Sequence, residues 1–470
     1  MRWGRPTFWT VFLLAAVAAG LLQIRLLADL NKNGGNMGDE AEMLCSMLRV
    51  QRGETLYRDY RQPPHVLALY MPAFYLVPGT LSRWLSATDD QTIFITRVYV
   101  YLAWIGVAVC LVALLRQAGG TWDTAAMAGL LWLAGAISIH SAHAARPDAL
   151  LILFSLAALW AYRRGWLVTA AILAVGAAFH KQNGGLVWLA LLAAELAGRR
   201  WQNVGKLGGG FIVVGGLGLM AAQFAWGDLF WLNPVQGLAR QYSFDRLGVV
   251  LWLTLLGGGV VWLTGFWGAA TAPAAWRWYF GFALAWAVIS SGGTGAGDNY
   301  FLEPYALACL LTAFAVSTGR GRNIVLGGLL VFLTAVTTIR ATTAADWWRR
   351  LTMRAQVRAQ EAAAWTDLLN RIGVPDQAVL IEDPALALRR DREPVLLNAS
   401  GLLTLQRAGR FDDSHIRQGI ERGKWPVIVL TAPMESPGGY RHFAAEWLGA
   451  MRGRYVLQEQ VGLYHIYRRE

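Results

Sequence analysis

Two acidic residues, Asp39 and Glu40, follow the first apolar segment of the chain, in the sequence Gly-Asp-Glu-Ala-Glu. A carboxylate in this place can act as a general base that removes the proton of an acceptor hydroxyl group while a new bond forms. The same pair can also be the solvated start of a helix, because carboxylates near a helix N-terminus complement the helix dipole. The pair is the first candidate for catalysis, and the structural alternative stays open.

Two isolated basic residues lie beside apolar segments. Lys181 separates two of them in Phe-His-Lys-Gln-Asn-Gly, and Arg146 precedes another in Ala-Arg-Pro-Asp. A cation at membrane depth is costly unless an anion meets it, so Lys181 is expected to have an anionic partner. Arg146 can pair with Asp148 or extend its side chain to the membrane interface.

The segments that must position these residues are apolar. The chain of 470 residues is 55% hydrophobic and only 15% charged, whereas soluble globular proteins carry roughly 25% charged residues. Apolar runs recur along the chain, each close to the length that crosses a hydrocarbon core of ~30 Å. They predict eleven transmembrane helices, at 7–30, 92–115, 123–140, 147–162, 166–180, 184–197, 207–226, 247–267, 276–290, 304–318 and 323–343.

The run at 66–85 contains Pro72 and Pro78, and we expect it to lie along the membrane surface without crossing. With the N-terminus inside, the cytoplasmic positions then carry eleven basic residues, and the short outer loops carry four, Arg146, Lys181, Arg240 and Arg246. This split satisfies the positive-inside rule, whereas a crossing run would invert it. Residues 31–91 are therefore predicted to form a first outer loop with juxtamembrane helices, including an amphipathic helix at 41–51.

The acidic residues of the membrane part gather on one side of this topology. Charged groups at membrane depth are costly, so a one-sided set indicates a polar cavity that opens outward. Alternatively, Asp228 and Asp245 are simply solvated loop residues. This explanation is weaker for Asp148, which lies inside an apolar run. The acidic residues on the outer side are Asp29, Asp148, Asp228, Asp245, Asp298 and Glu303.

The composition changes near residue 344, where charge density rises and apolar spans end. A helical pattern at 365–372 and β-branched runs at 378–381, 426–430 and 455–467 predict a small soluble α/β domain. We therefore divide the chain into a transmembrane domain, 1–343, and a soluble domain, 344–470, on the outer side. The predicted fold class is a membrane all-α protein with a small C-terminal α/β domain.

The order of these motifs resembles membrane glycosyltransferases of the GT-C fold, of the protein O-mannosyltransferase and aminoarabinose-transferase type. The motifs are the acidic pair after the first helix, Tyr-Arg-Asp-Tyr-Arg-Gln-Pro-Pro-His at 57–65, a proline-interrupted run, Ala-Arg-Pro-Asp at 145–148, Phe-His-Lys-Gln-Asn-Gly at 179–184, and Asp-Asn-Tyr-Phe-Leu-Glu-Pro at 298–304. The resemblance covers about residues 7 to 345, and it depends on the order of the motifs, since no single motif is specific.

The resemblance implies transfer of a sugar from a polyprenyl-phosphate donor, with inversion, to a lipid, glycan or protein acceptor. Asp39 would be the base, and Glu40 a neighbour that can share the role. The departing lipid phosphate needs positive partners. Lys181 and Arg146 are the main candidates for this role, with Arg61 and Arg240 as further options. Asp298, Asn299 and Glu303 would bind sugar hydroxyls or organise their loop, together with Asp148.

No resident cofactor or metal is predicted, because His65, His140, His143 and His180 match no familiar ligand spacing. Some GT-C enzymes nevertheless use a divalent ion. The basic residues do not form a stripe, so a nucleic-acid partner is not expected despite the net charge of +12. The expected partners are the lipid bilayer, the donor and an unidentified acceptor. The expected location is a bacterial inner membrane with the C-terminal domain in the periplasm.

Two other functions stay open. A transporter or flippase of a lipid-linked substrate is the first alternative, although such proteins are often built from repeated halves and no repeat is visible here. A non-catalytic assembly protein that binds a partner through its outer domain is the second.

Overall fold

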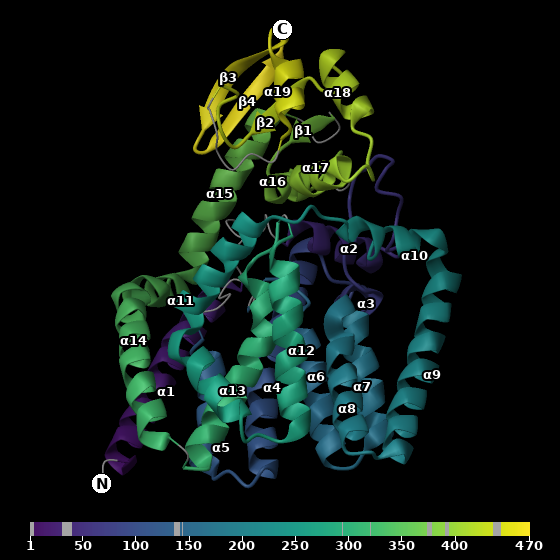
Figure 1. The fold of residues 1–470 in the computed structure, drawn as a ribbon. Helices are drawn as coiled ribbons and strands as arrows, with labels where there is room; N and C mark the ends of the chain where they lie inside the picture. The colour runs from purple at the N-terminus through teal and green to yellow at the C-terminus, as the bar shows by residue number, and fades with distance from the viewer. Residues whose placement is uncertain are drawn as a thin grey trace.

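The structure is a computed structural model, and it describes residues 4–30, 40–135, 142, 144–293, 295–319, 321–373, 378–390, 394–435 and 443–470. A helical bundle forms one end of the molecule, and a small α/β domain covers the other end of that bundle (Figure 1). The N-terminus lies at the end of the bundle far from the α/β domain.

Eleven helices of the described residues form the bundle, one at each predicted span, which confirms the predicted fold class. Six of them, α1, α4, α9, α11, α13 and α14, are long and apolar enough to cross a membrane by length and composition. The eleven helices are α1 (Gly4–Asp29), α4 (Asp89–Gln117), α5 (Trp122–Leu133), α6 (Asp148–Arg163), α7 (Leu167–His180), α8 (Leu186–Ala197), α9 (Trp201–Trp226), α11 (Phe244–Ala269), α12 (Ala274–Ser291), α13 (Leu302–Ser317) and α14 (Arg322–Thr352).

Helix α13 is central, because every residue from Leu302 to Val316 is buried. It packs against α11, α5 and α12, while α1 packs along α14. Helix α9 lies at the edge, where only Leu207 and Ala222 are buried and Phe224 is almost fully exposed. An apolar helix surface of this kind is expected to face lipid, because lipid chains are as apolar as the side chains that meet them.

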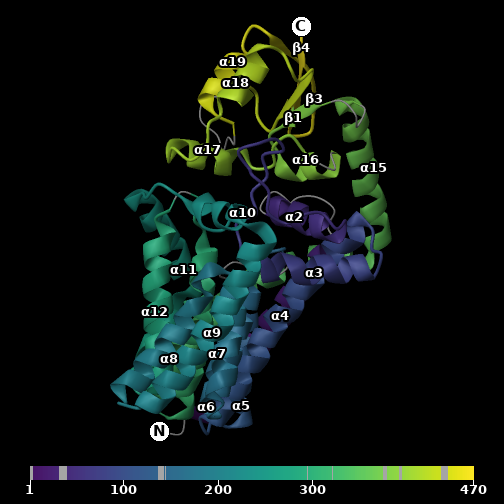
Figure 2. The same cartoon turned by 90° about the vertical axis from the view of Figure 1, so that its right-hand side faces the viewer.

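Two short helices lie between the bundle and the α/β domain (Figure 2). These are α2 (Ala41–Gln51) and α3 (Pro72–Trp84), and they pack against each other. Pro72 begins α3, in a position where its missing N–H is not needed for a helical hydrogen bond. Because α3 lies between the bundle and the α/β domain, the proline-interrupted run does not cross the bundle. Further short elements at this end are η3 (Gln182–Gly185), α10 (Asp228–Leu232), η4 (Gln236–Leu238) and η5 (Asp298–Phe301).

The C-terminal sheet has the order β1-β2-β4-β3, with β1 parallel to β2 and the other pairs antiparallel. A parallel pair needs a crossover connection, and three helices supply it here. The strands are β1 (Val379–Ile381), β2 (Val427–Leu430), β3 (Tyr455–Val461) and β4 (Tyr464–Arg469). The helices are α15 (Arg354–Ile372), α16 (Pro384–Arg390), α17 (Ala399–Arg407), α18 (Ser414–Glu421) and α19 (Ala445–Met451).

The first loop holds this domain in place. Tyr60 and Leu67 belong to the same buried apolar cluster as Leu380 and Trp425, and the backbone N–H of His65 donates to the carbonyl of Val395 over 3.0 Å. Because the loop and the domain share apolar cores, their relative position is part of the fold and not a loose association.

Candidate active site

A cavity of about 590 Å³ lies where the bundle end meets the α/β domain. Such a volume is typical of sites for small molecules. Its wall combines residues of α2, of the loops between the membrane helices, and of α16 and α17. The lining residues are Glu42, Met43, Leu67, Leu69, Tyr70, Tyr75, Arg146, Gly237, Ala239, Arg240, Arg246, Gly295, Gly297, Asp298, Asn299, Asp383, Pro384, Asn398, Ser400, Gly401, Thr404 and Thr431.

Three arginines line the membrane side of this cavity. Arg146 lies just before α6, Arg240 lies before α11, and Arg246 is in the first turns of α11. Arg240 donates to the hydroxyl of Tyr300 over 3.3 Å, and Arg246 donates to the carbonyl of Ala296 over 2.9 Å. Guanidinium groups held in this way can bind a phosphate through paired hydrogen bonds. Arg146 and Arg240 were predicted from the sequence, whereas Arg246 was counted there only as a loop charge.

A buried ion pair lies behind the cavity wall. The ammonium group of Lys181 contacts Oδ1 of Asp148 at 2.6 Å, with the two residues 7% and 2% exposed. The side-chain amide of Asn299 donates to the same oxygen over 3.2 Å, and the ring of Tyr300 lies 5.0 Å from the ammonium group. Asn299 itself lines the cavity, so the pair supports one of its walls. Asp148 is thus the anionic partner of Lys181.

Glu303, at the start of α13, accepts a second group of buried hydrogen bonds. Its carboxylate accepts from the side-chain amide of Asn183 over 3.0 Å and from the hydroxyl of Tyr279 over 2.6 Å. These bonds join the loop after α7 to α12 and α13. Glu303 therefore holds the loop of Lys181 in place, while Asp298 and Asn299 reach the cavity.

Glu40 is buried and lies away from the described cavity wall. Oε1 of Glu40 pairs with Arg97, and Oε2 accepts from the backbone N–H of Ala145 over 2.5 Å. Arg97 also donates to the carbonyl of Leu30 over 3.3 Å. This set joins the end of α1 to α4 and to the loop before α6. Asp39, the main candidate for the base, lies outside the described residues.

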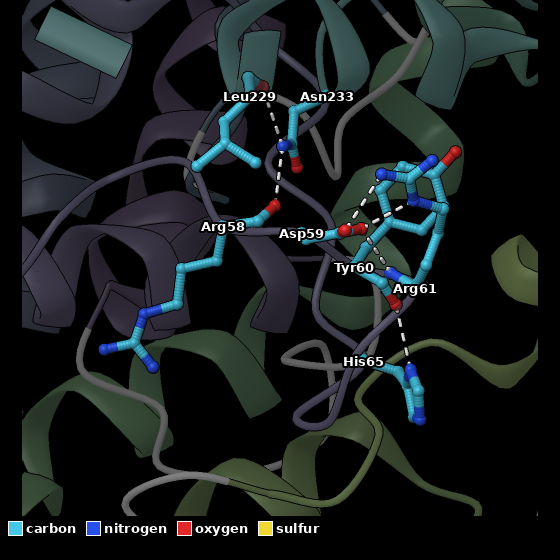
Figure 3. Close-up of polar contacts among 7 residues, drawn as sticks. All are labelled: Arg58, Asp59, Tyr60, Arg61, His65, Leu229 and Asn233. Atoms are coloured by element: carbon cyan, nitrogen blue, oxygen red, sulfur yellow. Dashed lines mark hydrogen bonds and ion pairs between the residues drawn. The ribbon is translucent and has the colours of Figure 1, made fainter. Parts of the chain in front are cut away.

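Arg61 lies on the surface of the first loop and pairs with Asp59, with nitrogen to oxygen distances of 2.8 and 2.9 Å (Figure 3). It is not among the described residues that line the cavity. The neighbouring loop is held by Asn233, which donates to the carbonyls of Arg58 and Leu229 and accepts from the backbone N–H of Ala68. The structure therefore separates Arg61 from Arg146 and Arg240.

The sequence analysis did not select Glu42, which lines the cavity and is 8% exposed. Burial raises the pKa of the Glu42 carboxyl to about 7, although Asn398 hydrogen-bonds it and Arg240 attracts its charge. A carboxyl group with a pKa in this range can exchange a proton near neutral pH. The signal in the sequence was a third acidic residue in an amphipathic helix, where a solvated position was the simpler expectation.

Among the described residues, no group of three His, Cys, Asp or Glu side chains is placed to hold a metal ion. His140 and His143 lie outside the described residues. His180 contacts the hydroxyl of Tyr99, and His65 contacts His415 at the base of the α/β domain. The prediction that no metal is required stays a prediction.

The chain matches no protein-family model, and no curated protein matches it in sequence. Among solved structures it is similar to ArnT from Cupriavidus metallidurans, in a form bound to undecaprenyl phosphate and in the apo state. Each comparison has a TM-score of 0.60 and 16% sequence identity, and covers 97% of both chains. At this identity the similarity establishes the architecture. The chain has the GT-C fold of the aminoarabinose transferase ArnT.

Proposed function

We propose that the chain is a glycosyltransferase that moves a sugar from a polyprenyl-phosphate donor to a lipid, glycan or protein acceptor, with inversion. The observation that carries this proposal is the cavity at the bundle end, where Arg146, Arg240 and Arg246 lie beside acidic and hydroxyl groups. The similar fold of ArnT, solved with undecaprenyl phosphate, supports the same type of donor.

The arginines would hold the donor phosphate. The phosphate of a polyprenyl-phosphate sugar bears one negative charge before transfer and gains charge as the sugar departs, so cations near it stabilise the transition state more than the bound substrate. Arg146 and Arg240 are the ligands that we propose, with Lys181 and Arg61 as the other candidates from the sequence. Helix α11 carries Arg246 and, further along, exposed apolar side chains such as Val249 and Trp252, a surface that suits the prenyl chain.

The transfer itself would be a single displacement. The acceptor oxygen forms a bond to the anomeric carbon while the bond from that carbon to the phosphate oxygen breaks. Polyprenyl phosphate leaves with the electron pair, and the acceptor proton passes to a carboxylate. We propose Asp39 as that carboxylate, with Glu40 as a neighbour that can share the role. One displacement on the anomeric carbon inverts its configuration.

The location follows from the same topology. We propose an inner-membrane protein with the cavity and residues 344–470 in the periplasm, because the sparse positive charges of the outer loops lie at the cavity end of the bundle. A C-terminal alkaline phosphatase fusion, which is active only outside the cytoplasm, tests this orientation. An inactive C-terminal fusion with full expression would reverse it.

The function is tested with purified full-length protein in lipid nanodiscs, a panel of radiolabelled undecaprenyl-phosphate sugars and a membrane extract as acceptor. Asp39→Asn should abolish the release of undecaprenyl phosphate and leave its binding unchanged. Arg240→Gln should weaken the binding of undecaprenyl phosphate by about tenfold, since a charged hydrogen bond contributes roughly 1.5–3 kcal/mol. Arg417→Gln is the matched control, because Arg417 is exposed on α18 and lies outside the described cavity wall.

Each outcome separates the alternatives. Release of undecaprenyl phosphate that depends on Asp39 supports the enzyme. Binding of the donor without release, in the presence of transport across a liposome membrane, favours a transporter of lipid-linked substrates. Equal turnover by Asp39→Asn and the unmodified protein contradicts the proposed base.

A further inference from the structure

The α/β domain supplies one wall of the cavity, with amide and hydroxyl groups and the carboxyl group of Asp383. Asn398 caps α17, because its side-chain oxygen accepts from the N–H of Gly401 over 2.7 Å. Ser400 and Thr404 are four residues apart and therefore lie on one face of α17, and both line the cavity. Thr431, directly after β2, lines it too. This wall carries hydroxyl and amide groups, whereas the three arginines lie on the membrane side.

Glu42 gives independent support for a ligand beside this wall. It lies in α2 and lines the same cavity, and its Oε1 is buried without a hydrogen-bond partner in the described part of the chain. Asn398 hydrogen-bonds the Glu42 carboxyl, which links α2 directly to the cap of α17. Buried polar atoms in folded proteins nearly always have a partner. An unsatisfied carboxylate oxygen at a cavity wall therefore indicates that a donor group of a ligand binds there.

The remaining wall indicates which ligand would fit. Tyr70 and Tyr75 line the same cavity, and Tyr70 is partly exposed, so its ring offers an apolar surface there. A carboxyl group, an amide and two hydroxyls can each exchange hydrogen bonds with neighbouring hydroxyl groups of a sugar ring. Aromatic rings supply the apolar contact that the carbon face of such a ring needs. The combination fits a saccharide better than a second phosphate, because the ionisable groups at this wall are the carboxyl groups of Glu42 and Asp383, whose negative charge would repel a phosphate.

We infer that Glu42, Asn398, Ser400 and Thr404 form a saccharide subsite to which the C-terminal domain contributes three of the four side chains. The inference deepens the proposed transferase function and rests on it for the origin of the sugar. The ring can belong to the donor or to a glycosylated acceptor, since both present vicinal hydroxyls. The carboxyl group of Glu42, with its pKa near neutrality, can accept or donate at this position.

Two binding experiments on the full-length protein in nanodiscs distinguish the sources. The donor experiment compares the affinity for plain undecaprenyl phosphate with that for undecaprenyl-phosphate glucose, mannose and arabinose. The acceptor experiment measures the binding of a radiolabelled membrane glycolipid extract to protein saturated with undecaprenyl phosphate. The variants are Glu42→Gln and Thr404→Val, which keep side-chain size, and the control is Thr318→Val at the opposite end of the bundle. Thermal unfolding confirms that each variant is folded.

We expect Glu42→Gln and Thr404→Val to weaken one of the two saccharide-dependent affinities by about tenfold, which is the size of one lost hydrogen bond to a buried carboxylate. The affinity for plain undecaprenyl phosphate should stay within twofold. Loss in the donor experiment assigns the subsite to the transferred sugar, and loss in the acceptor experiment assigns it to the acceptor.

The inference is overturned if both variants match Thr318→Val in both experiments, or if they weaken the binding of plain undecaprenyl phosphate by the same factor. Neither experiment depends on turnover. A protein that shows the expected saccharide-dependent loss but transfers no sugar would support the subsite and contradict the transferase function.

Discussion

The buried pair of Lys181 and Asp148 makes a quantitative prediction. Lys181→Met removes the cation and leaves the carboxylate of Asp148, which is 2% exposed, at the end of an apolar bundle. Removing one partner of a buried ion pair costs roughly 3–5 kcal/mol. Arg146 also acts electrostatically on Asp148, so part of the charge stays compensated. We therefore expect the lower end of that range, about 3 kcal/mol of lost unfolding free energy.

The double variant Lys181→Met, Asp148→Leu removes both charges. Replacing a buried ion pair with apolar side chains is often close to neutral, so this variant should recover to within about 1 kcal/mol of the unmodified protein. The assay is reversible unfolding by SDS in mixed micelles, followed by tryptophan fluorescence. Lys206→Met is the matched control, because Lys206 is exposed on α9 near the other end of the bundle.

A loss below about 1 kcal/mol for Lys181→Met, or no recovery in the double variant, would refute this reasoning. The double variant also tests whether Lys181 binds the donor phosphate. Recovered stability with lost affinity for undecaprenyl phosphate would assign Lys181 to the phosphate. Recovery of both would show that Lys181 serves only to neutralise Asp148.

Three further predictions concern titratable and charged groups at the end of the bundle near the α/β domain. Burial raises the pKa of Glu42 from 4.5 to about 7. The contribution of this carboxyl group to stability is therefore complete below pH 4.5 and is lost as pH rises through 7. Glu42→Gln should gain up to about 3 kcal/mol of unfolding free energy relative to the unmodified protein by pH 8, measured by SDS unfolding across pH. Burial lowers the pKa of His65 from 6.5 to about 4, with His415 and Lys424 adding to the effect while the Tyr60 carbonyl and Asp59 oppose it. Its contribution is present above pH 6.5 and is lost as pH falls through 4, so limited proteolysis should release the α/β domain faster at pH 4 than at pH 7, and equal rates would contradict a role for His65 in docking. Glu40→Gln removes the carboxylate charge that pairs with the buried Arg97 and should cost about 3 kcal/mol in the same SDS unfolding assay, whereas a loss close to zero would contradict a structural role.

The bundle helices could be predicted because membrane insertion depends on local composition. Apolar runs and the positive-inside rule act on each segment almost independently, and the eleven bundle helices match the eleven runs. The proline-interrupted run at 66–85 was predicted not to cross because of its two prolines and the charge distribution, and α3 lies between the bundle and the α/β domain. Helix ends were less predictable. Helix α14 continues to Thr352, beyond the apolar run that ends at residue 343, because composition marks the limit of the membrane and not the limit of hydrogen bonding.

Part of the candidate site could be predicted for the same reason. A charged residue beside an apolar run is costly at membrane depth unless it has a partner or a function. Arg146, Asp148 and Lys181 could therefore be selected without a structure. Their pairing could not be read from the sequence, where Arg146 was a natural partner for Asp148 two residues away. In the structure Asp148 forms its ion pair with Lys181, 33 residues further along the chain, because α6 and α7 pack side by side.

The sequence by itself determined the membrane class, the number of bundle helices and the small α/β unit at the C-terminus, since each depends on composition along short stretches. Only the tertiary structure decided that Glu42 lies against Asn398, that α17 lines the same cavity as three arginines, and that Glu40 pairs with Arg97. These contacts join residues from distant parts of the chain. They depend on how the α/β domain docks on the first loop, which is a property of packing between segments and leaves no local pattern in any one of them.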